Sequence, residues 1–153
     1  MKPISRNPFV YIASPFFNDR EVAVVEQIKS ILKQNSLSFF SPKDDMLYDP
    51  KTMTPADVLT VNVQALHNTD LTVCVTDGKD PGTLFEAGWC YAQGIPIIYI
   101  WLSGKEGQKF NLVLAASGAV VRSFDQLDQA INEVKQSGTF EAKNWSEETM
   151  DYE

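Results

Sequence analysis

Apolar and polar residues alternate along this chain in two different patterns. Short, almost continuous apolar runs predict five strands, at 9–13, 37–40, 70–75, 96–101 and 119–122. Between these runs, cap residues and apolar side chains spaced three or four positions apart predict helices that begin near residues 18, 54, 83, 111 and 125. Strands that alternate with helices in this way are typical of an α/β fold with a parallel sheet.

We therefore predict one α/β domain over residues 1–153, a doubly wound, flavodoxin-like, five-stranded parallel sheet with helices on both faces. Residues 41–53 are predicted to form a polar loop. Residues 141–153 are predicted to form an acidic tail that packs on a neighbour or frays. Ligands of such sheets bind outside the carboxyl ends of the strands. Chemistry is therefore expected in the turns after the first, third and fourth strands.

The charge balance narrows the classes of ligand. Thirteen basic and twenty acidic side chains give a net charge of -7, which argues against binding nucleic acid or anionic membranes. A small uncharged ligand fits this charge better. The start of the chain has no signal peptide, and no apolar run reaches the roughly 20 residues of a membrane span, so we expect a cytoplasmic protein.

Cofactor motifs are not found in the sequence. Cys74 and Cys90 lie in apolar runs and are predicted to be buried thiols, and with a single histidine they make no metal site. No Gly-x-Gly-x-x-Gly or Walker-type loop is present. We expect neither a metal nor an organic cofactor.

Three carboxylates follow the third predicted strand, namely Asp77, Asp80 and Glu86. A carboxylate in the first turns of a helix faces the positive end of the helix dipole, which favours its ionised form and suits a nucleophile. A structural alternative stands beside this one. Thr83-x-x-Glu86 fits a capping box, in which Glu86 only bonds the backbone of Thr83, and spacing alone favours that reading.

Other polar and aromatic candidates each have a structural alternative. Tyr11 lies near the carboxyl end of the first strand, where it reaches a carboxylate or is simply a core tyrosine. Phe16 and Phe17 follow in a loop, where they stack on a flat base or cover the end of the sheet. Asn62 shares a helix face with apolar residues and points to a pocket or to the core. His67 is predicted to interact with a helix C-terminus rather than to act as a base.

Three segments decide between these alternatives. Asp77-Gly-Lys-Asp-Pro-Gly-Thr-Leu-Phe-Glu-Ala-Gly-Trp-Cys-Tyr-Ala-Gln-Gly-Ile-Pro96 resembles the signature of the nucleoside 2-deoxyribosyltransferase family. Ser14-Pro-Phe-Phe17 and Phe40-Ser-Pro42 resemble two further blocks of the family, in the same order and at the same spacing. The likeness spans roughly residues 9 to 115 and leaves the tail uncovered.

The resemblance implies four catalytic residues. Glu86 corresponds to the nucleophile that attacks the anomeric carbon of the deoxyribose, and Tyr11 to the tyrosine that orients this carboxylate. Asp80 corresponds to the aspartate that binds the sugar near its 3'-hydroxyl and helps to move a proton. Asn62 stands where the family usually has an aspartate that contacts and protonates the nucleobase. Because an amide cannot deliver a proton, we expect slower turnover.

The resemblance also implies substrate-binding residues and partners. Phe16 and Phe17 match the aromatic pair that lines the base pocket, Gly82 belongs to the binding segment, and Asn111 matches an asparagine that a neighbouring subunit contributes to the 5'-hydroxyl. Sites shared in this way imply a homo-oligomer, a dimer-based tetramer or hexamer. Some members end in a tyrosine that completes the neighbouring site, whereas this chain ends Asp151-Tyr-Glu153.

The implied reaction exchanges the nucleobase of 2'-deoxyribonucleosides with free purine or pyrimidine bases. It proceeds through a covalent deoxyribosyl-glutamate with retention and ping-pong kinetics, with slow hydrolysis as a side reaction. Two alternatives remain open. One is a deoxynucleoside 5'-monophosphate N-glycosidase, and the other is a non-catalytic nucleotide-sensing module.

Overall fold

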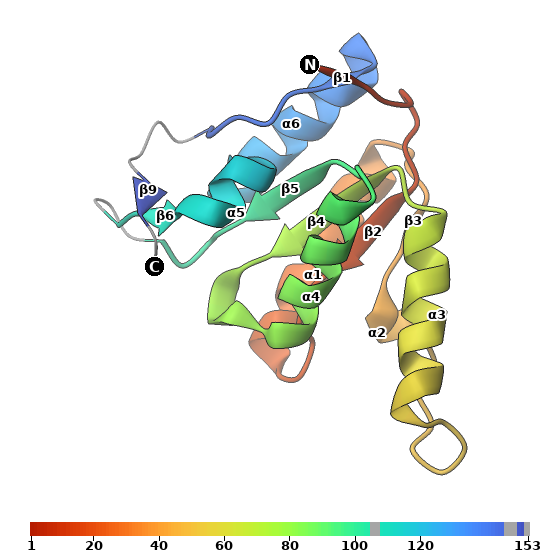
Figure 1. Cartoon of the computed structure of the whole chain (residues 1–153). Helices are drawn as coiled ribbons and strands as arrows, with labels where there is room; N and C mark the ends of the chain where they lie inside the picture. Colours follow the sequence, from red (N-terminus) through yellow and green to blue (C-terminus); the bar gives the residue numbers. More distant parts are fainter. Residues whose placement is uncertain (105–107, 146–149, 152–153) are drawn as a thin grey trace.

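A five-stranded parallel sheet forms the centre of the computed structural model, which describes residues 1–104, 108–145 and 150–151 (Figure 1). Its strands, in the order in which they lie side by side, are β3 (Phe39–Phe40), β2 (Val10–Ala13), β4 (Leu71–Val75), β5 (Ile97–Ile100) and β7 (Ala119–Val121). All neighbouring pairs are parallel. In chain order this arrangement is 2-1-3-4-5, so the predicted doubly wound, flavodoxin-like sheet is confirmed.

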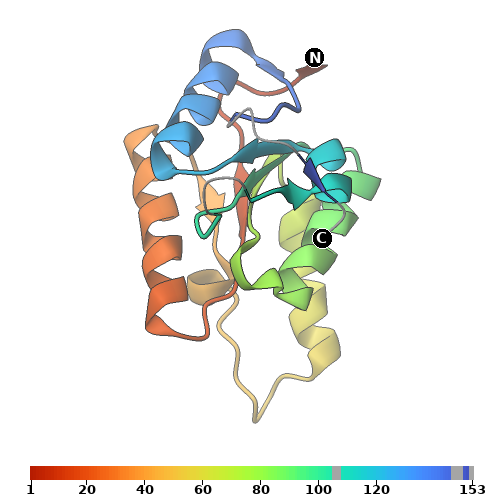
Figure 2. The same ribbon diagram turned by 90° about the vertical axis from the view of Figure 1, so that its left-hand side faces the viewer.

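Helices cover both faces of the sheet, as predicted. They are α1 (Asp19–Gln34), α2 (Pro42–Asp45), α3 (Pro55–His67), α4 (Pro81–Ala92), α5 (Leu112–Ser117) and α6 (Phe124–Ser137). Figure 2 shows α1 and α6 on one side of the sheet and α3, α4 and α5 on the other. Two small pairings lie outside the main sheet, β1 (Lys2–Pro3) with β8 (Thr139–Phe140) and β6 (Phe110–Asn111) with β9 (Met150–Asp151).

The side chains of each strand alternate between two apolar clusters. The cluster under α1 and α6 contains Val10, Ile12, Val73 and Ile98 from the strands. The cluster under α3, α4 and α5, which we call the α4-side cluster, contains these buried residues: Tyr11, Ala13, Leu66, Cys74, Ala87, Cys90, Ile97, Tyr99, Phe110 and Val120. Its two cysteines are free thiols. Alternate residues of one strand therefore reach opposite layers.

Local signals explain where the helices begin and end. Asn18 caps α1 by accepting a hydrogen bond from the Glu21 amide, as the sequence predicts. Thr54 and Asp57 form a reciprocal capping box at the start of α3. Gly94, with φ of 73°, ends α4 in the left-handed conformation, which glycine adopts without strain.

Two predictions about irregular segments need correction. The expected polar loop contains the one-turn helix α2, because the Asp45 carboxylate accepts from the Ser41 amide and Pro42 suits a first helical position. The start of the tail neither frays nor needs a neighbour. The Val120 amide donates to Lys143, the Trp145 amide donates to Val120, and Trp145 packs on the cluster under α1 and α6. In the part of the chain described, no helix combines the length and apolar character of a membrane span.

Close packing against β5 leaves no room for a side chain at Gly118. A Cβ atom at Gly118 would lie 2.4 Å from the Ile97 carbonyl oxygen and 2.9 Å from the Tyr99 ring. We expect Gly118→Ala to lower the free energy of unfolding by about 3 kcal/mol, because the backbone of β5 cannot move aside cheaply. Urea-induced unfolding measures the difference.

Gly88→Ala is the matched control. Gly88 lies within α4, and a Cβ atom there would meet nothing within 4 Å. We expect this variant to be as stable as the parent or more stable by up to about 1 kcal/mol, from helix propensity alone. Equal losses in both variants would contradict the steric explanation.

Candidate active site

The helix that carries Glu86 begins at an aspartate cap. Asp80 Oδ2 accepts hydrogen bonds from both the Thr83 amide and the Thr83 hydroxyl, each at 2.9 Å, and Pro81 occupies the first helical position. The predicted start of this helix at Thr83 is therefore wrong by two residues. The capping box between Thr83 and Glu86 is wrong for the same reason, since Asp80 already holds the Thr83 amide.

Glu86 lies in the second turn of α4, and its Oε2 atom is buried with no hydrogen-bond partner among the described residues. The pKa of Glu86 is raised to about 7, chiefly by burial; the Tyr11 hydroxyl opposes this rise and the charge of Asp80 adds to it. The prediction that the helix dipole keeps this carboxylate fully ionised at neutral pH is wrong. Desolvation outweighs the dipole because Glu86 lies beyond the first turn.

Tyr11 faces Glu86 from the neighbouring strand β2. Its side chain is buried in the α4-side cluster, and its ring stacks on Phe40 with 5.5 Å between centroids. Burial raises the pKa of Tyr11 far above its ordinary value, and the nearby Glu86 carboxylate adds to this rise. The two groups interact, yet no hydrogen bond of normal length and angle joins them among the described atoms. A small movement of either side chain would form that bond.

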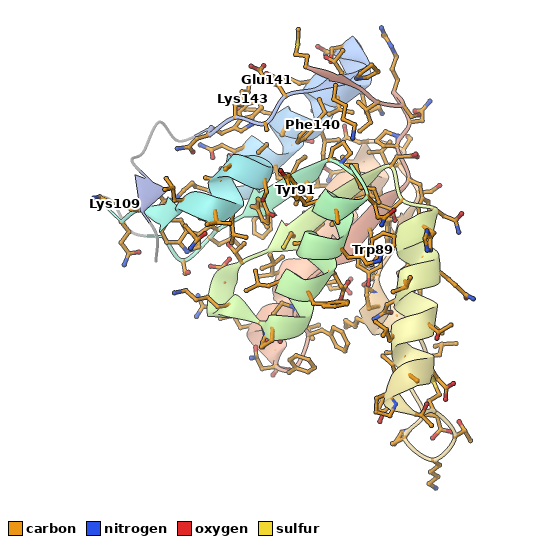
Figure 3. All side chains as sticks on the ribbon, viewed as in Figure 1. Trp89, Tyr91, Lys109, Phe140, Glu141 and Lys143 are labelled. Atoms are coloured by element: carbon orange, nitrogen blue, oxygen red, sulfur yellow. The ribbon has the colours of Figure 1, made fainter. Side chains whose placement is uncertain are left out.

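Helices α3 and α4 pack against each other over the same face of the sheet. The rings of His67 and Trp89 meet edge to face at 4.9 Å, which joins the last turn of α3 to the last turns of α4. His67 therefore has a packing contact, in keeping with its position at a helix end rather than at a catalytic centre. Figure 3 shows Trp89 at this junction between the two helices.

Asn62 and Glu86 hold corresponding positions on these two helices. Asn62 precedes Leu66 by one turn of α3, and Glu86 precedes Cys90 by one turn of α4, while Leu66 and Cys90 share the α4-side cluster. Both helices run antiparallel to the strands, so one turn earlier means closer to the carboxyl ends. The buried Asn62 Oδ1 has no hydrogen-bond partner among the described residues. The sequence left Asn62 open as a core or pocket residue, and neither of the two pockets described below is lined by it.

Buried polar atoms without partners are rare in folded proteins, because each one costs about 1–3 kcal/mol. Tyr11 Oη, Asn62 Oδ1 and Glu86 Oε2 are three such atoms on one face of one sheet. No group in the described part of the chain satisfies these three atoms. The three residues therefore have the properties of a site that binds a polar ligand.

An open pocket of about 490 Å³ lies at the carboxyl edge of the sheet, between the start of α1 and the turn that leads into α4. Asp80, Phe17 and Arg20 are among its lining residues, but Glu86, Tyr11 and Asn62 are not. Phe17 is 73% exposed and its ring lies 5.2 Å from that of Phe16, which does not line the pocket.

Gly82 and Asp80 are close neighbours at the pocket. A Cβ atom at Gly82 would lie only 3.3 Å from Asp80 Oδ2. The glycine therefore leaves the side of this carboxylate uncovered. A larger side chain at this position would shield the carboxylate that the sequence assigns to sugar binding.

Asn111 lies elsewhere. It caps α5 by accepting a hydrogen bond from the Leu114 amide at 3.0 Å, and it lines a second open pocket of about 680 Å³. The residues lining that pocket include Leu84, Lys79 and Trp101, but none of the catalytic candidates.

Two further contacts support the site, and only one of them involves a residue that the sequence analysis named. Asp77, one of the three predicted candidates, accepts hydrogen bonds from the Leu102 and Ser103 amides and so ties the turn after β4 to the loop after β5. Thr72 and Cys90 bond to each other at 3.1 Å beneath Glu86. The spacing of Cys90 from Glu86, one helical turn, was the signal that could have revealed this layer. The described residues contain no cluster of His, Cys, Asp or Glu suited to a metal ion.

Because Glu86 is buried, we expect it to make the free energy of unfolding depend on pH. A carboxyl whose pKa is raised on folding stabilises the protein below its unfolded pKa of 4.5, and this stabilisation is lost as the pH rises through about 7. Glu86→Gln keeps the shape and cannot ionise. We expect the variant to gain up to about 3 kcal/mol over the parent chain between pH 4.5 and pH 8.

Chemical unfolding at several pH values measures this gain. Glu141→Gln, at an exposed position, is the matched control and should show no such trend. If the difference in free energy of unfolding between Glu86→Gln and the parent chain stayed constant with pH, the raised pKa of buried Glu86 would be contradicted.

Comparison with known proteins places this geometry in a family. The family model for nucleoside 2-deoxyribosyltransferase matches residues 10–131. No curated protein matches the chain in sequence. The fold is similar to that of a 2-deoxyribosyltransferase from Bacillus psychrosaccharolyticus, with a TM-score of 0.67 and 22% identity over 78% of this chain and 90% of that one. It is also similar to the CMP N-glycosidase of Clostridium botulinum, with a TM-score of 0.58 and 17% identity over 82% of this chain and 98% of that one.

The matched region begins with the strand that carries Tyr11, and it contains Asn62, Asp80, Glu86 and Asn111. By this match over most of its length, the chain belongs to the nucleoside 2-deoxyribosyltransferase family.

Proposed function

We propose that this protein transfers 2-deoxyribose between nucleobases through a covalent ester on Glu86. The observation that carries the proposal is the buried Glu86 carboxylate, which interacts with Tyr11 and has one oxygen, Oε2, without a hydrogen-bond partner among the described residues, in the second turn of a helix that begins at the carboxyl edge of the sheet. A carboxylate in such a place is poorly solvated. It therefore attacks carbon more readily than an exposed one.

The proposed reaction has two halves. In the first, Glu86 attacks the anomeric carbon as the C1'–N bond to the base breaks, and the Tyr11 hydroxyl donates to the carboxylate and orients it. In the second, another base attacks from the side that the first one left. The β configuration is thus retained. Deoxyribose forms the oxocarbenium-like transition state more readily than ribose, because no 2'-hydroxyl withdraws charge. When water replaces the second base, slow hydrolysis results.

The pocket beside α4 is the proposed place of the nucleoside. Asp80 binds the sugar near its 3'-hydroxyl, a role supported by its position at the pocket wall and by the glycine that leaves it uncovered. Phe16 and Phe17 offer aromatic surface to the base, with Phe17 at the pocket itself. Asn62 provides an amide that hydrogen-bonds to the base.

We also propose a homo-oligomer with shared sites, built from dimers into a tetramer or hexamer. Asn111 lines a pocket of its own, and in this proposal it serves the 5'-hydroxyl in the site of a neighbouring subunit. Large exposed apolar side chains on the helices of this face support such packing, namely Leu59, Phe85, Tyr91 and Val113. In Figure 3, Tyr91 and Trp89 lie on the α4 side of the molecule.

A second candidate function is removal of the base from deoxynucleoside 5'-monophosphates. Arg20 favours it, because this residue lines the same pocket as Asp80 and a guanidinium binds phosphate well. Comparison of thymidine with its 5'-monophosphate as donors separates the two functions. A non-catalytic nucleotide sensor would form no sugar ester on Glu86 with either compound.

The first test uses Glu86→Ala. We expect this variant to lose transfer of deoxyribose from thymidine to uracil by at least about a thousandfold, since no other group takes over the attack. Chromatography of the products measures transfer, and mass spectrometry of the parent chain with thymidine alone should show the added deoxyribosyl group. Glu141→Ala, at an exposed position, is the control. Full activity of Glu86→Ala with an unchanged oligomer would refute the proposal.

The second test follows pH. Only ionised Glu86 attacks, so kcat/KM for thymidine should rise with pH and level off above about 7, the pKa of this carboxyl. The Tyr11 hydroxyl lowers the pKa of Glu86, so Tyr11→Phe should move the midpoint to higher pH. A midpoint that stays in place in Tyr11→Phe would contradict the interaction between the two groups.

A further inference from the structure

The pocket of about 490 Å³ has two walls that come from different elements. The start of α1 and the loop before it contribute Phe17 and Glu21, and the turn into α4 contributes Asp77 and Asp80. Asp80 also acts on Glu86, since its charge adds to the raised pKa of that carboxyl. A ligand that fills this pocket lies between α1 and the start of the helix that carries Glu86.

Several polar groups of this pocket already have partners within the chain. The Ser14 hydroxyl donates to the Pro15 carbonyl. Both oxygens of Asp77 accept hydrogen bonds from backbone amides of the loop after β5. Asp80 Oδ2 accepts from the amide and the hydroxyl of Thr83. These contacts hold the walls in place and occupy the atoms that make them.

Glu21 differs from these groups because only one of its carboxylate oxygens is engaged. Glu21 Oε1 accepts from the side-chain amide of Asn18 at 2.5 Å, and Asn18 Oδ1 accepts from the Glu21 backbone amide. Glu21 Oε2 is buried and has no hydrogen-bond partner among the described residues. Buried polar atoms of this kind are rare in folded proteins. Capping of α1 accounts for one oxygen of Glu21 and leaves the other for a ligand.

The position of Glu21 favours contact with the base rather than with the sugar. Phe17 lines the same pocket, comes directly before the Asn18 cap, and is 73% exposed. A flat base that stacks on this ring turns its edge, which carries its hydrogen-bonding groups, toward neighbouring side chains. Asp80, on the other wall, is the residue proposed to bind near the 3'-hydroxyl. The base lies beyond C1' of the sugar, away from that hydroxyl, and so on the side of Glu21.

We propose that Glu21 selects nucleobases that carry an exocyclic amino group, so that the enzyme prefers 2'-deoxycytidine to 2'-deoxyuridine. This inference rests on the proposed function and deepens it. A carboxylate oxygen accepts hydrogen bonds and donates none. Glu21 Oε2 therefore accepts from the amino group of cytosine. Uracil has a carbonyl oxygen at the same position of the ring, and two acceptors facing each other repel.

The ring N–H of uracil does not replace the amino group. This N–H lies between two carbonyls, so a carboxylate that accepts from it also approaches both carbonyl oxygens. A hydrogen bond to a carboxylate is stronger than one between neutral groups, and burial of Glu21 Oε2 strengthens it further. Adenine and guanine also carry amino groups. The selection therefore separates amino from carbonyl groups rather than purines from pyrimidines.

Binding of the two nucleosides tests the proposal without catalysis. The Glu86→Gln chain cannot form the sugar ester, so calorimetry measures the affinity of intact 2'-deoxycytidine and 2'-deoxyuridine. We expect 2'-deoxycytidine to bind about tenfold or more tightly, the usual effect of one hydrogen bond to a charged group. Equal affinities, or tighter binding of 2'-deoxyuridine, would overturn the inference.

Glu21→Gln in the same chain assigns the preference to one side chain. Glutamine keeps the size of the side chain and an oxygen for Asn18, while its amide nitrogen donates to a carbonyl. We expect the preference for 2'-deoxycytidine to disappear or to reverse. Glu26→Gln, at an exposed position of the same helix, is the matched control and should keep the preference. A preference that survives Glu21→Gln would refute the role given to Glu21.

Transfer by the otherwise unmodified chain provides a second measurement. The ratio of kcat/KM for 2'-deoxycytidine to kcat/KM for 2'-deoxyuridine should fall about tenfold or more in Glu21→Gln. Differences between the two leaving bases cancel, because the same donors are compared in both proteins. An unchanged ratio, with the sugar ester still formed on Glu86, would overturn this inference and leave the proposed function intact. If no deoxynucleoside binds and no ester forms, the proposed function fails and this inference fails with it.

Discussion

Burial of an acidic side chain against a tyrosine, with one carboxylate oxygen left without a hydrogen-bond partner among the described residues, is the constraint on which the rest of this structure depends. Transfer of Glu86 from water raises its pKa from 4.5 to about 7, which corresponds to about 3 kcal/mol against the ionised form. The fold tolerates this cost because the layers above and below are well packed. Burial of the apolar side chains around Tyr11, Leu66 and Cys90 stabilises the fold and offsets the cost of burying the Glu86 carboxylate.

The supporting contacts make sense in view of that cost. Asp80 holds the first turn of α4 through Thr83, Thr72 bonds Cys90 one turn below Glu86, and Trp89 meets His67 where α4 and α3 join. These contacts fix the helix in its first turn, through Asp80, and in its last turn, through Trp89 and Cys90. A helix held at both ends keeps a buried carboxylate in place, whereas a loose helix would let it rotate toward water.

Much of the architecture could be predicted from the sequence because its signals are local. The run 96–101, the cap at Asn18 and the glycine at Gly94 each specify a strand, a helix start or a helix end within a few residues. The start of α4 was misplaced because two overlapping cap patterns compete there. Asp80 rather than Thr83 is the N-cap residue of α4. The proline that follows Asp80 suits the first helical position, because it has no amide hydrogen that would be left unpaired there.

The site was harder to predict than the fold because its properties depend on contacts between distant segments. The sequence identified Tyr11, Asn62 and Glu86 as candidates, but not that their polar atoms are buried together without partners. The sign of the shift at Glu86 was wrong for the same reason. A helix dipole is visible in the sequence, whereas the loss of water around a side chain depends on β2 and α4 packing together.

Both edges of the central sheet are closed to further strands. At one edge, Lys143 and Trp145 bond to β7, so that the tail already occupies the positions an added strand would need. At the other edge, β3 has only two residues, and α2 begins at Pro42 after the single residue Ser41. Edge-to-edge pairing between molecules, a common route to aggregation, is therefore disfavoured at both edges, by the tail at one and by the short β3 at the other. Any assembly of this fold must use its helical surfaces, and the helices that expose large apolar side chains are those that flank Glu86.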